Sequence, residues 1–375
     1  MTRPAYELSL ESKVTDPPRT YHFHTADGVC SKDSFRTAEL GLLEHVWNSE
    51  LGTVLCPEAN YGVVGTVLSD TADSLLMTAS SARAARLCER NSRENRADAS
   101  VACLADLSTV DRQFDTVAYA PKSYTALQIG KQRVADALSR LRPSGRCYIA
   151  ASKRTGLSRY EDCLGELTST VERVGKFGKY RILRAIRPLT YTAPSYVTPR
   201  KICPQIDDVE LSLVTVPGLF SPSSLDDGTR LLIEAANVED GERVLDLCCG
   251  YGAVGVHAGR VADCGLWLTD VDTVATNCAE RSLRESNVDA TVVTADGIEG
   301  VANVTFDRIL CNPPTHAGDG VLADLFDGAY TVLDSDGQLS IVHHRELDLR
   351  DHLSRFDSVE QCRTGDEHVV LNAIP

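Results

Sequence analysis

The sequence has no apolar run that approaches the roughly 20 residues needed for a helix to cross a lipid bilayer. Its amino-terminal stretch, MTRPAYELSLESK, also lacks the charged segment followed by an apolar segment that is typical of a secretory signal. The composition, 43% hydrophobic and 6% aromatic over 375 residues, is typical of two globular domains with ordinary cores. We therefore expect a cytoplasmic protein that has no membrane partner.

The 13 cysteines include no CxxC pair and no other spacing typical of a zinc site. Two of them, Cys248 and Cys249, are adjacent, and the others are scattered along the chain. An odd number of cysteines without a paired framework is typical of small buried side chains in a reducing compartment. The sequence thus predicts neither disulfide bonds nor a bound metal.

Lysine is scarce, and the charge of the chain is unevenly distributed. Only 8 of the 38 basic residues are lysines, and Asp outnumbers Glu by 32 to 21. Residues 1–200 hold 27 basic and 22 acidic residues, a balance of +5, whereas residues 201–375 hold 11 and 31, a balance of −20. The first half is therefore the better candidate for contact with a polyanion. The acidity also resembles that of proteins from salt-loving microbes, so it can reflect habitat instead of a ligand.

The chain repeats itself at a distance of about 190 residues. YGVVG at 61–65 matches YGAVG at 251–255, and FDTVAYAPKSY at 114–124 matches FDRILCNPPTH at 306–316. Several matches in the same order indicate two copies of one domain, and hence a duplication.

Strand and helix patterns alternate within each copy. In the second copy, strands are expected at 243–247, 265–269, 290–295, 306–311 and 338–343, and helices at 253–261, 274–286 and 320–333. Such alternation implies a mostly parallel sheet with helices on both faces. The sequence thus predicts an α/β protein of two tandem Rossmann-like domains.

A proline-rich stretch, 187–205, separates the two copies and is typical of an extended connector. We expect a first domain at residues 1–190, a linker at 191–209 and a second domain at 210–375.

The second copy has a glycine loop between a predicted strand and a predicted helix. Gly250, Gly252 and Gly255 allow a tight turn and bring backbone N–H groups close to a ligand at the start of the helix. Asp270 follows at the end of the next strand, where a carboxylate can bind ribose hydroxyls. This pattern alone fits a dinucleotide site, another nucleoside site or a purely structural turn.

The rest of this copy resembles the class I S-adenosylmethionine-dependent methyltransferases. Asp246 in VLDL stands where that family has an acid, and Asp296 in TADG stands where it has a polar residue after the third strand. The resemblance implies S-adenosyl-L-methionine as the cofactor, with Asp246 and the glycine loop at the methionine part, Asp270 at the ribose and Asp296 at the adenine. Cys248 replaces the family's usual first glycine. The residues expected to bind the cofactor are Thr229, Asp246, Cys248, Gly250, Gly252, Asp270, Asp296 and Asn312.

Asn312, Pro313 and Pro314 end a predicted buried strand, although proline removes a donor from a strand ladder. An exocyclic amine is a weak nucleophile because its lone pair is delocalised. The Asn312 side-chain oxygen and the Pro313 carbonyl oxygen would accept its two N–H groups and aim the lone pair, and proline would fix the second acceptor in advance. We therefore predict that these three residues catalyse methyl transfer to an amino nitrogen. A proline turn that only ends the strand is the structural alternative.

Further upstream, VPGLFSPSSLDDGTRLLIE at 216–234 leads into the strand of the glycine loop. With this stretch, the duplication and NPP.H, the chain resembles the tandem-domain guanine-N2 methyltransferases of 16S rRNA over almost its whole length. The resemblance implies that the second domain methylates a guanine amine of ribosomal RNA, with the small ribosomal subunit as partner. It also implies that the first domain has lost cofactor binding and holds RNA or stabilises the second domain.

The first copy agrees with such a loss. Cys56 stands in place of Asp246, Asn60 in place of Gly250, and Ala120-Pro121-Lys122 in place of Asn-Pro-Pro. Its basic residues lie mainly between Lys153 and Arg187, with aromatic residues between them. Such a set can contact phosphates and stack on bases, although a solvated basic face is the alternative in an arginine-rich chain. The residues expected to contact RNA from this domain are Lys153, Arg154, Lys176 and Lys179.

The family normally has an aromatic residue after Asn-Pro-Pro, and this chain has Thr315. Phe220 is a candidate for the missing stacking surface, and His316 is a candidate hydrogen-bonding group near the base. We expect Phe220, Thr315 and His316 to contact the substrate.

Other functions remain open from the sequence. The acceptor could be another RNA base or a protein glutamine amide, because the same motif serves both. A protein of a different class, a non-catalytic RNA-binding or assembly factor, is a further alternative. A nicotinamide dehydrogenase is least favoured, because nothing after the glycine loop provides for hydride chemistry.

Overall fold

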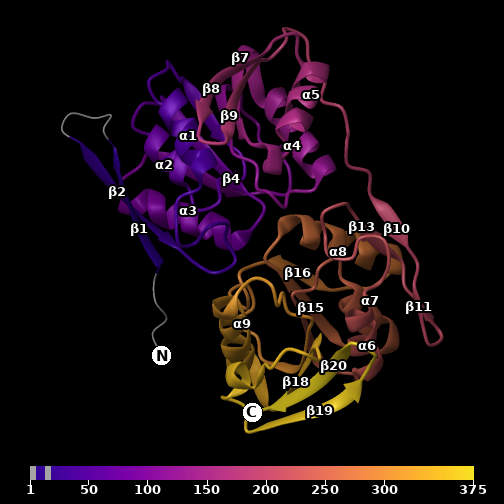
Figure 1. Ribbon diagram of the computed structural model, residues 1–375. Coiled ribbons are helices and arrows are strands. Elements are labelled where there is room, and N and C mark those ends of the chain that lie inside the picture. Colours follow the sequence, from indigo (N-terminus) through magenta and orange to yellow (C-terminus); the bar gives the residue numbers. More distant parts are fainter. Residues whose placement is uncertain (1–5, 13–17) are drawn as a thin grey trace. The chain divides into compact units, whose positions relative to one another are not determined.

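The computed structural model describes residues 6–12 and 18–375, and the chain forms two compact units, Met1–Val197 and Thr198–Pro375. Figure 1 colours the first unit from indigo to magenta and the second mainly from orange to yellow. Part of the amino-terminal stretch without a signal pattern lies outside the described residues.

The first unit contains a seven-stranded sheet with the order β5-β4-β3-β6-β7-β9-β8. Its strands are β3 (Thr53–Cys56), β4 (Ser74–Ala79), β5 (Ala99–Cys103), β6 (Phe114–Tyr119), β7 (Leu141–Ala151), β8 (Val171–Phe177) and β9 (Tyr180–Ile186). Its helices are α1 (Thr37–Val46), α2 (Val63–Leu68), α3 (Ala82–Glu94), α4 (Leu127–Arg140) and α5 (Leu157–Leu167). A separate antiparallel hairpin of β1 (Tyr6–Ser12) and β2 (Arg19–Thr25) precedes them.

The second unit repeats this sheet with the order β16-β15-β14-β17-β18-β20-β19. Its strands are β14 (Arg243–Leu247), β15 (Gly265–Asp270), β16 (Thr291–Thr294), β17 (Phe306–Cys311), β18 (Leu333–His344), β19 (Ser358–Thr364) and β20 (His368–Ile374). Its helices are α6 (Asp227–Ala235), α7 (Ala253–Val261), α8 (Thr273–Ser286) and α9 (Asp319–Val332).

In both sheets the first five strands pair in parallel, and the last two pairings are antiparallel. Seven corresponding strands in the same order confirm the predicted duplication and the predicted α/β fold. The closing strands β19 and β20 were not among the strands that the sequence predicts. β19 lies at the edge of the sheet with mostly exposed side chains, so it lacks the apolar run that makes the central strands recognisable.

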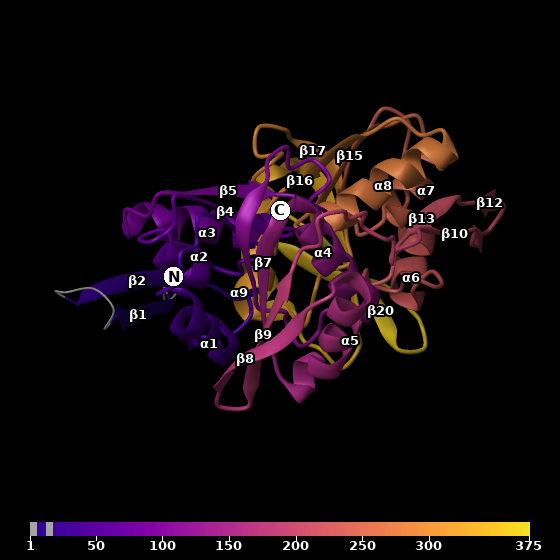
Figure 2. The ribbon, with the colours of Figure 1, turned by 90° about the horizontal axis from the view of Figure 1, so that it is seen from above.

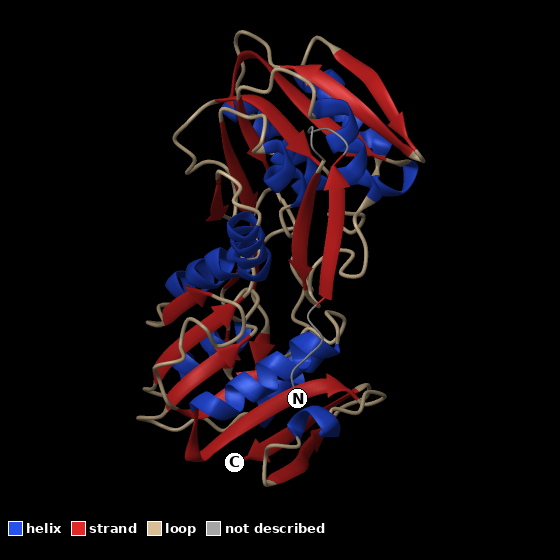
Figure 3. Cartoon of the chain, turned by 90° about the vertical axis from the view of Figure 1, so that its left-hand side faces the viewer, coloured by secondary structure: helices blue, strands red, loops and turns tan. Residues whose placement is uncertain are grey.

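Helices cover both faces of each sheet, as Figures 2 and 3 show. In the first unit, α1, α2 and α3 contribute to one apolar cluster, and α4 and α5 contribute to a cluster on the other face. In the second unit, α9 packs on the face that carries Leu245, Ile309 and Ile341. Because helices cover both faces, the central strands are almost continuously apolar, and this explains why their sequences are recognisable.

The proline-rich stretch is tied to both units. Tyr191 donates its hydroxyl to the Ala135 carbonyl at 3.0 Å, and the Tyr196 N–H donates to Gln132 at 2.6 Å. Further along, β10 (Arg200–Ile202) pairs with β13 (Leu213–Thr215), and β11 (Gln205–Ile206) pairs with β12 (Val209–Glu210).

The direction of chain progression reverses between β14 and β17. From β14 the chain moves outward to β15 and β16, and after β16 it returns to the other side of β14 as β17. In open α/β sheets, ligands bind beyond the carboxyl ends of the strands at such a reversal. The glycine loop after β14 and the Asn-Pro-Pro segment after β17 both lie at this edge.

Candidate active site

The loop after β14 has a left-handed backbone at three alternate positions. The φ angles are +63° at Cys248, +56° at Gly250 and +84° at Gly252. A Cβ atom at Gly252 would lie only 3.1 Å from Ala279, whereas a Cβ at Gly250 would meet nothing within 4 Å. Gly252 is thus required for the close approach of α8, and Gly250 faces open space.

The amides of these glycines are used within the loop. Gly250 N–H donates to Asp270 Oδ2 at 2.9 Å, and Gly252 N–H donates to the Cys249 carbonyl at 2.8 Å. Asp270 Oδ1 also accepts the Asp272 N–H at 2.9 Å. The carboxylate of Asp270 therefore holds the loop and the next turn together at the end of β15, and burial raises its pKa above the ordinary value.

Asp246 lies beneath the loop and is only 2% exposed. Its Oδ2 accepts the Gly255 N–H at 2.8 Å and thereby fixes the first turn of α7. Burial raises the pKa of Asp246 to about 7, the Gly255 N–H opposes this rise, and the charge of Asp270 adds to it. Asp246 shapes the loop from below in this structure. Asp296 is also buried; it follows the end of β16 and precedes Gly297, which has a φ of +62°.

Cys248 packs against the apolar cluster that contains Cys311. A hydrogen bond with the Cys311 thiol, together with burial, holds the pKa of the Cys248 thiol well above its usual value. Cys248 therefore fills the position as a small protonated side chain. All 13 cysteines are free thiols.

Asn312 is half-buried at the end of β17, and its amide nitrogen has two acceptors. Asn312 Nδ2 donates to Thr229 Oγ1 at 2.9 Å and lies 3.4 Å from Asp226 Oδ2. The Asn312 side-chain oxygen accepts no hydrogen bond within the part of the chain that the structure describes. The amide is thus oriented with its oxygen turned away from α6.

Pro313 is buried, and its carbonyl accepts the Thr315 N–H at 2.9 Å. The Pro314 carbonyl accepts the Ala317 N–H at the same distance. A carbonyl oxygen has two lone pairs, so that of Pro313 can accept a second hydrogen bond. The turn therefore fixes the acceptor that the sequence analysis assigned to Pro313.

Asp226 is part of this arrangement, although the sequence analysis included it only in the stretch 216–234 and gave it no role in the site. It is the N-cap of α6, because its Oδ2 accepts the Thr229 N–H at 2.9 Å. The spacing Asp-x-x-Thr before an apolar helix is a recognisable capping signal. That signal could have located the cap, but not its contact with Asn312, 86 residues away.

The predicted substrate residues lie on loops. Phe220 is 65% exposed, and His316 is exposed while Thr315 is half-buried. The Tyr251 hydroxyl lies 3.5 Å from the Ser221 and Ser224 carbonyls, so the loop of Phe220 is tied to the glycine loop.

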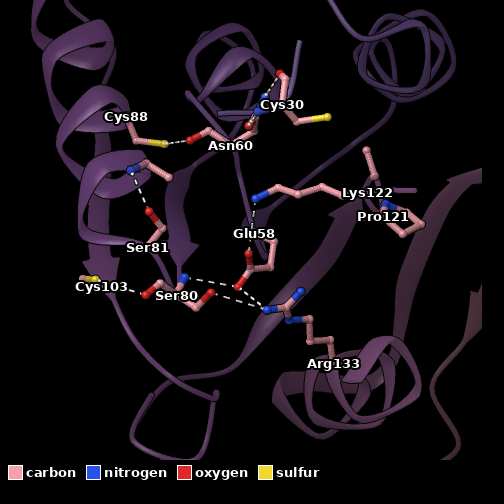
Figure 4. Close-up of polar contacts among 12 residues, drawn as sticks. Cys30, Glu58, Asn60, Ser80, Ser81, Cys88, Cys103, Pro121, Lys122 and Arg133 are labelled. Atoms are coloured by element: carbon pink, nitrogen blue, oxygen red, sulfur yellow. Dashed lines mark hydrogen bonds and ion pairs between the residues drawn. The ribbon is translucent and has the colours of Figure 1, made fainter. Parts of the chain in front are cut away.

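The first unit has the same loop geometry with different side chains. Glu58, Asn60 and Gly62 have φ angles of +52°, +60° and +90°, matching Cys248, Gly250 and Gly252. Figure 4 shows that Asn60 reaches across to Cys30, donating to its carbonyl at 2.9 Å and accepting its N–H at 3.0 Å. The corresponding space at Gly250 is open.

Glu58 fills the next part of this loop. Its carboxylate lies 2.9 Å from Arg133 and 3.7 Å from Lys122, and it accepts the Ser80 N–H at 3.1 Å (Figure 4). Burial alone would raise the pKa of Glu58, but Arg133 and Lys122 hold it below the ordinary value. Glu58 is therefore a half-buried anion whose charge is neutralised by Arg133 and Lys122 of its own unit.

Arg36 lies between the start of α1 and the strand-end residues Ala120 and Pro121 of the first unit. It stands at the N-cap of α1, as Asp226 does at that of α6, and pairs with the buried Glu39 at 3.0 Å. Its guanidinium donates to the carbonyls of Ala120 and Pro121 at 3.0 and 2.8 Å. Ala120 and Pro121 stand in place of Asn312 and Pro313, so in the first unit a side-chain cation binds the backbone carbonyls at the end of the strand.

The predicted RNA contacts of the first unit gather at one end of its sheet. Lys153 and Arg154 follow the end of β7, and Lys176 and Lys179 flank the β8–β9 turn, which lies opposite because Ala151 pairs with Arg181. All four side chains are exposed. Arg173 and Arg184 on the same hairpin are paired with Glu161 and Glu172.

Residues 6–12 and 18–375 contain neither a helix suited to span a membrane nor a cluster suited to hold a metal ion. None of the helices there combines the length and apolarity needed to cross a membrane. No group of three or more His, Cys, Asp or Glu side chains in that part of the chain is arranged to hold a metal ion.

The sheet order with its reversal point and the glycine loop after β14 are those of a class I methyltransferase. The chain belongs to the methyltransferase small domain family, which matches it twice, at residues 20–184 and 210–372. The two matches confirm that both units derive from the same domain.

Two relatives and one solved structure are similar to this chain. Ribosomal RNA small subunit methyltransferase C of Pseudoalteromonas atlantica is 25% identical over 258 residues, 67% of this chain and 74% of that protein. Ribosomal RNA large subunit methyltransferase G of Aeromonas hydrophila is 27% identical over 230 residues, 58% and 59% of the two proteins. A T. thermophilus 16S rRNA N2 methyltransferase in complex with AdoMet and guanosine matches with a TM-score of 0.81 and 21% identity, and covers 100% of both chains. At that identity the structural match establishes the shared fold.

Proposed function

We propose that this protein transfers a methyl group from S-adenosylmethionine to the exocyclic N2 amine of a guanine in small-subunit ribosomal RNA. The observation that carries this proposal is the orientation of Asn312. Its nitrogen is held by Thr229 and Asp226, so its oxygen remains as an acceptor beside the Pro313 carbonyl. Two fixed acceptors suit an amine with two N–H groups.

The open space beside Gly250 supports cofactor binding by the second unit, because the matching space in the first unit is filled. Where the first unit fills the loop with the Asn60 side chain, the second leaves open space beside Gly250. Asp270 stands at the end of β15, where it can accept the ribose hydroxyls, and the buried Asp296 stands at the end of the next strand, where it can meet the adenine amine. Asp246, Cys248 and Gly252 would shape the wall around the methionine part, and Thr229 lies at the same edge. When bound, the cofactor supplies an electrophilic methyl group on a positively charged sulfur.

The residues of the chain act on the acceptor amine. Asn312 Oδ1 and the Pro313 carbonyl accept one N–H each, and this draws the nitrogen towards tetrahedral geometry and directs its lone pair. Pro313 and Pro314 hold the turn rigid, so little reorganisation is needed when the substrate arrives. Phe220, Thr315 and His316 would surround the base on the open side, where Phe220 offers an exposed ring for stacking.

The first unit is proposed to hold the RNA. Lys153, Arg154, Lys176 and Lys179 form an exposed basic group at one end of its sheet, and the internal network at Glu58 and Arg36 leaves no comparable space for a cofactor. Ribosomal RNA as substrate agrees with the cytoplasmic location expected from the sequence.

Transfer of tritiated methyl groups tests the proposal directly. The protein, at high salt, is offered purified small subunits, large subunits, free 16S and 23S rRNA, and a ribosomal protein fraction, all from cells that lack the enzyme. We expect label in 16S rRNA, and digestion should give N2-methylguanosine. Label only in protein would contradict the proposal, and label only in 23S rRNA would assign the chain to the large-subunit reaction instead.

A further inference from the structure

Three side chains connect the start of α6 with the end of β17. Asn312 Nδ2 donates to Thr229 Oγ1 at 2.9 Å, and Thr229 Oγ1 lies 3.2 Å from Asp226 Oδ2. The same carboxylate oxygen accepts the Thr229 N–H at 2.9 Å and lies 3.4 Å from Asn312 Nδ2. The connection spans more than 80 residues of sequence.

The chemistry of these groups permits only one orientation of the Asn312 amide. A carboxylate accepts hydrogen bonds only, and the Thr229 hydroxyl has a single hydrogen, which it donates to Asp226. Both neighbours therefore present lone pairs to Asn312, and only its NH2 group can face them. A flipped amide would set its oxygen against two acceptors and would leave the catalytic face with donors.

The support of this arrangement is rigid. Asp226 caps α6, and the helix is anchored by the buried side chains of Leu231, Leu232 and Ile233. Capping fixes the first turn of a helix and thus the position of its third residue, which here is Thr229.

The first unit joins the same two positions with reversed polarity. There the N-cap residue is Arg36, which donates to the Ala120 and Pro121 carbonyls, and Glu39 stands in place of Thr229. In the first unit, the Arg36 guanidinium donates hydrogen bonds to the carbonyls at the strand end. In the second unit, the Asp226 carboxylate accepts from the Asn312 nitrogen, so the Asn312 oxygen stays available as an acceptor. The contact between helix and strand is therefore structural in both units, and its polarity differs between them.

We propose that Asp226 and Thr229 are positioning residues for methyl transfer, and that they act by setting the orientation of the Asn312 amide. This inference rests on the proposed function of Asn312 and differs from the sequence expectation that Thr229 binds the cofactor.

Isosteric and conservative variants of Thr229 provide the test. Thr229→Val keeps the shape and loses the hydroxyl, so we expect kcat to fall about 30- to 100-fold with the cofactor Kd within about twofold. Thr229→Ser keeps the hydroxyl and should stay within about threefold of the original kcat. Asp226→Asn keeps the helix cap but can present an NH2 group to Asn312. Its kcat should lie between those of Thr229→Val and Thr229→Ser. Asp227→Asn changes a neighbouring exposed acid and serves as the control.

Two results would overturn the inference. If Thr229→Val raised the cofactor Kd while kcat at saturating cofactor recovered, Thr229 would be a cofactor ligand. If the losses of Thr229→Val and Asn312→Ala multiplied in the double variant, Thr229 would act independently of Asn312.

A double-mutant cycle measured on protein stability separates this inference from the proposed function. The urea midpoints of Thr229→Val, Asn312→Ala and the double variant require no methyl acceptor. We expect the double variant to shift the midpoint by less than the sum of the single shifts, because both single changes break the same hydrogen bond. Additive shifts would refute the positioning role. If RNA took no label while the cycle stayed non-additive, the proposed substrate would fail but the amide orientation would stand.

Discussion

The two units of this protein are alike in backbone and opposite in their chemistry. The loops after β3 and β14 share three left-handed positions, and the tyrosines Tyr61 and Tyr251 contact corresponding carbonyls. In the first unit, this frame is filled by the charged groups of Arg36 and Glu58. In the second, it is left open beside Gly250 and ends in an oriented amide.

The first unit, which we propose binds no cofactor, does not leave an empty loop. Its Asn60 side chain binds Cys30 where the second unit has open space beside Gly250, and the buried charges of Arg36 and Glu39 are paired with each other, as buried ions require. A unit built in this way can fold around its own network without cofactor.

The largest loss of activity is expected when Asn312 of the second unit is replaced by alanine, the residue at the matching position of the first unit. Asn312→Ala reproduces Ala120 at the strand end and removes one of two acceptors for the amine. Methyl transfer should fall by about 10³-fold, while the cofactor Kd stays nearly unchanged, because the loss concerns the acceptor only. Steady-state kinetics and calorimetry measure the two quantities. A variant that lost cofactor binding instead would give Asn312 a different role.

The buried pair of the first unit should be the most sensitive point for stability. Arg36→Met leaves Glu39, which is 2% exposed, without its partner, and removing one member of a buried pair costs about 3–5 kcal/mol. Urea unfolding at fixed salt measures this loss. The double variant Arg36→Met/Glu39→Leu should recover most of it, because no unpaired charge remains. A single variant as stable as the parent would show that the network does not support the first unit.

Asp246 should make the second unit respond to pH. Its pKa is about 7 in the folded protein against 3.8 ordinarily, so the folded state binds the proton more tightly and loses stability as pH rises from about 4 to 7. Relative to Asp246→Asn, the loss should reach roughly 4 kcal/mol above pH 7. Cys56 occupies this position in the first unit, and burial raises its pKa to about 12, so it adds no such dependence. Equal pH profiles of parent and variant would contradict this prediction.

Cofactor binding should depend on the second unit alone. Asp270→Ala removes the carboxylate that holds the loop and is proposed to meet the ribose, and we expect the cofactor Kd to rise about 100-fold, as for loss of a charged hydrogen bond. Calorimetry should also give one cofactor per chain for the parent. A stoichiometry of two would show that the side chains in the first unit can be displaced.

The smallest effects are expected at the basic end of the first unit. Lys153→Gln and Lys176→Gln should each weaken RNA binding a few-fold and reduce the slope of log affinity against log salt by about one. Arg184→Gln is the matched control, because Arg184 is already paired with Glu172. Equal slopes for all three variants would place the RNA elsewhere.

Much of the fold could be predicted because its signals are local. The helix expected at 253–261 is α7, and the strands expected at 243–247 and 306–311 are β14 and β17. The strand expected at 338–343 is part of a longer observed strand, β18, which spans Leu333–His344. For the site, the sequence placed Asn312, Asp270 and Gly250 at strand ends, and their roles remain predictions. It did not show that Asp226 faces Asn312 or that Asp246 lies beneath the loop.

The sequence by itself determined the duplication, the α/β architecture and the positions of the glycine loop and Asn-Pro-Pro, because apolar runs and turn residues act on the backbone where they stand. Only the tertiary structure decided which side chains meet. The direction of the Asn312 amide and the filling of the first unit by Asn60 and Arg36 depend on loops far apart in sequence that converge at one sheet edge. Whether such loops present donors or acceptors to each other follows from their packing, and no local pattern encodes it.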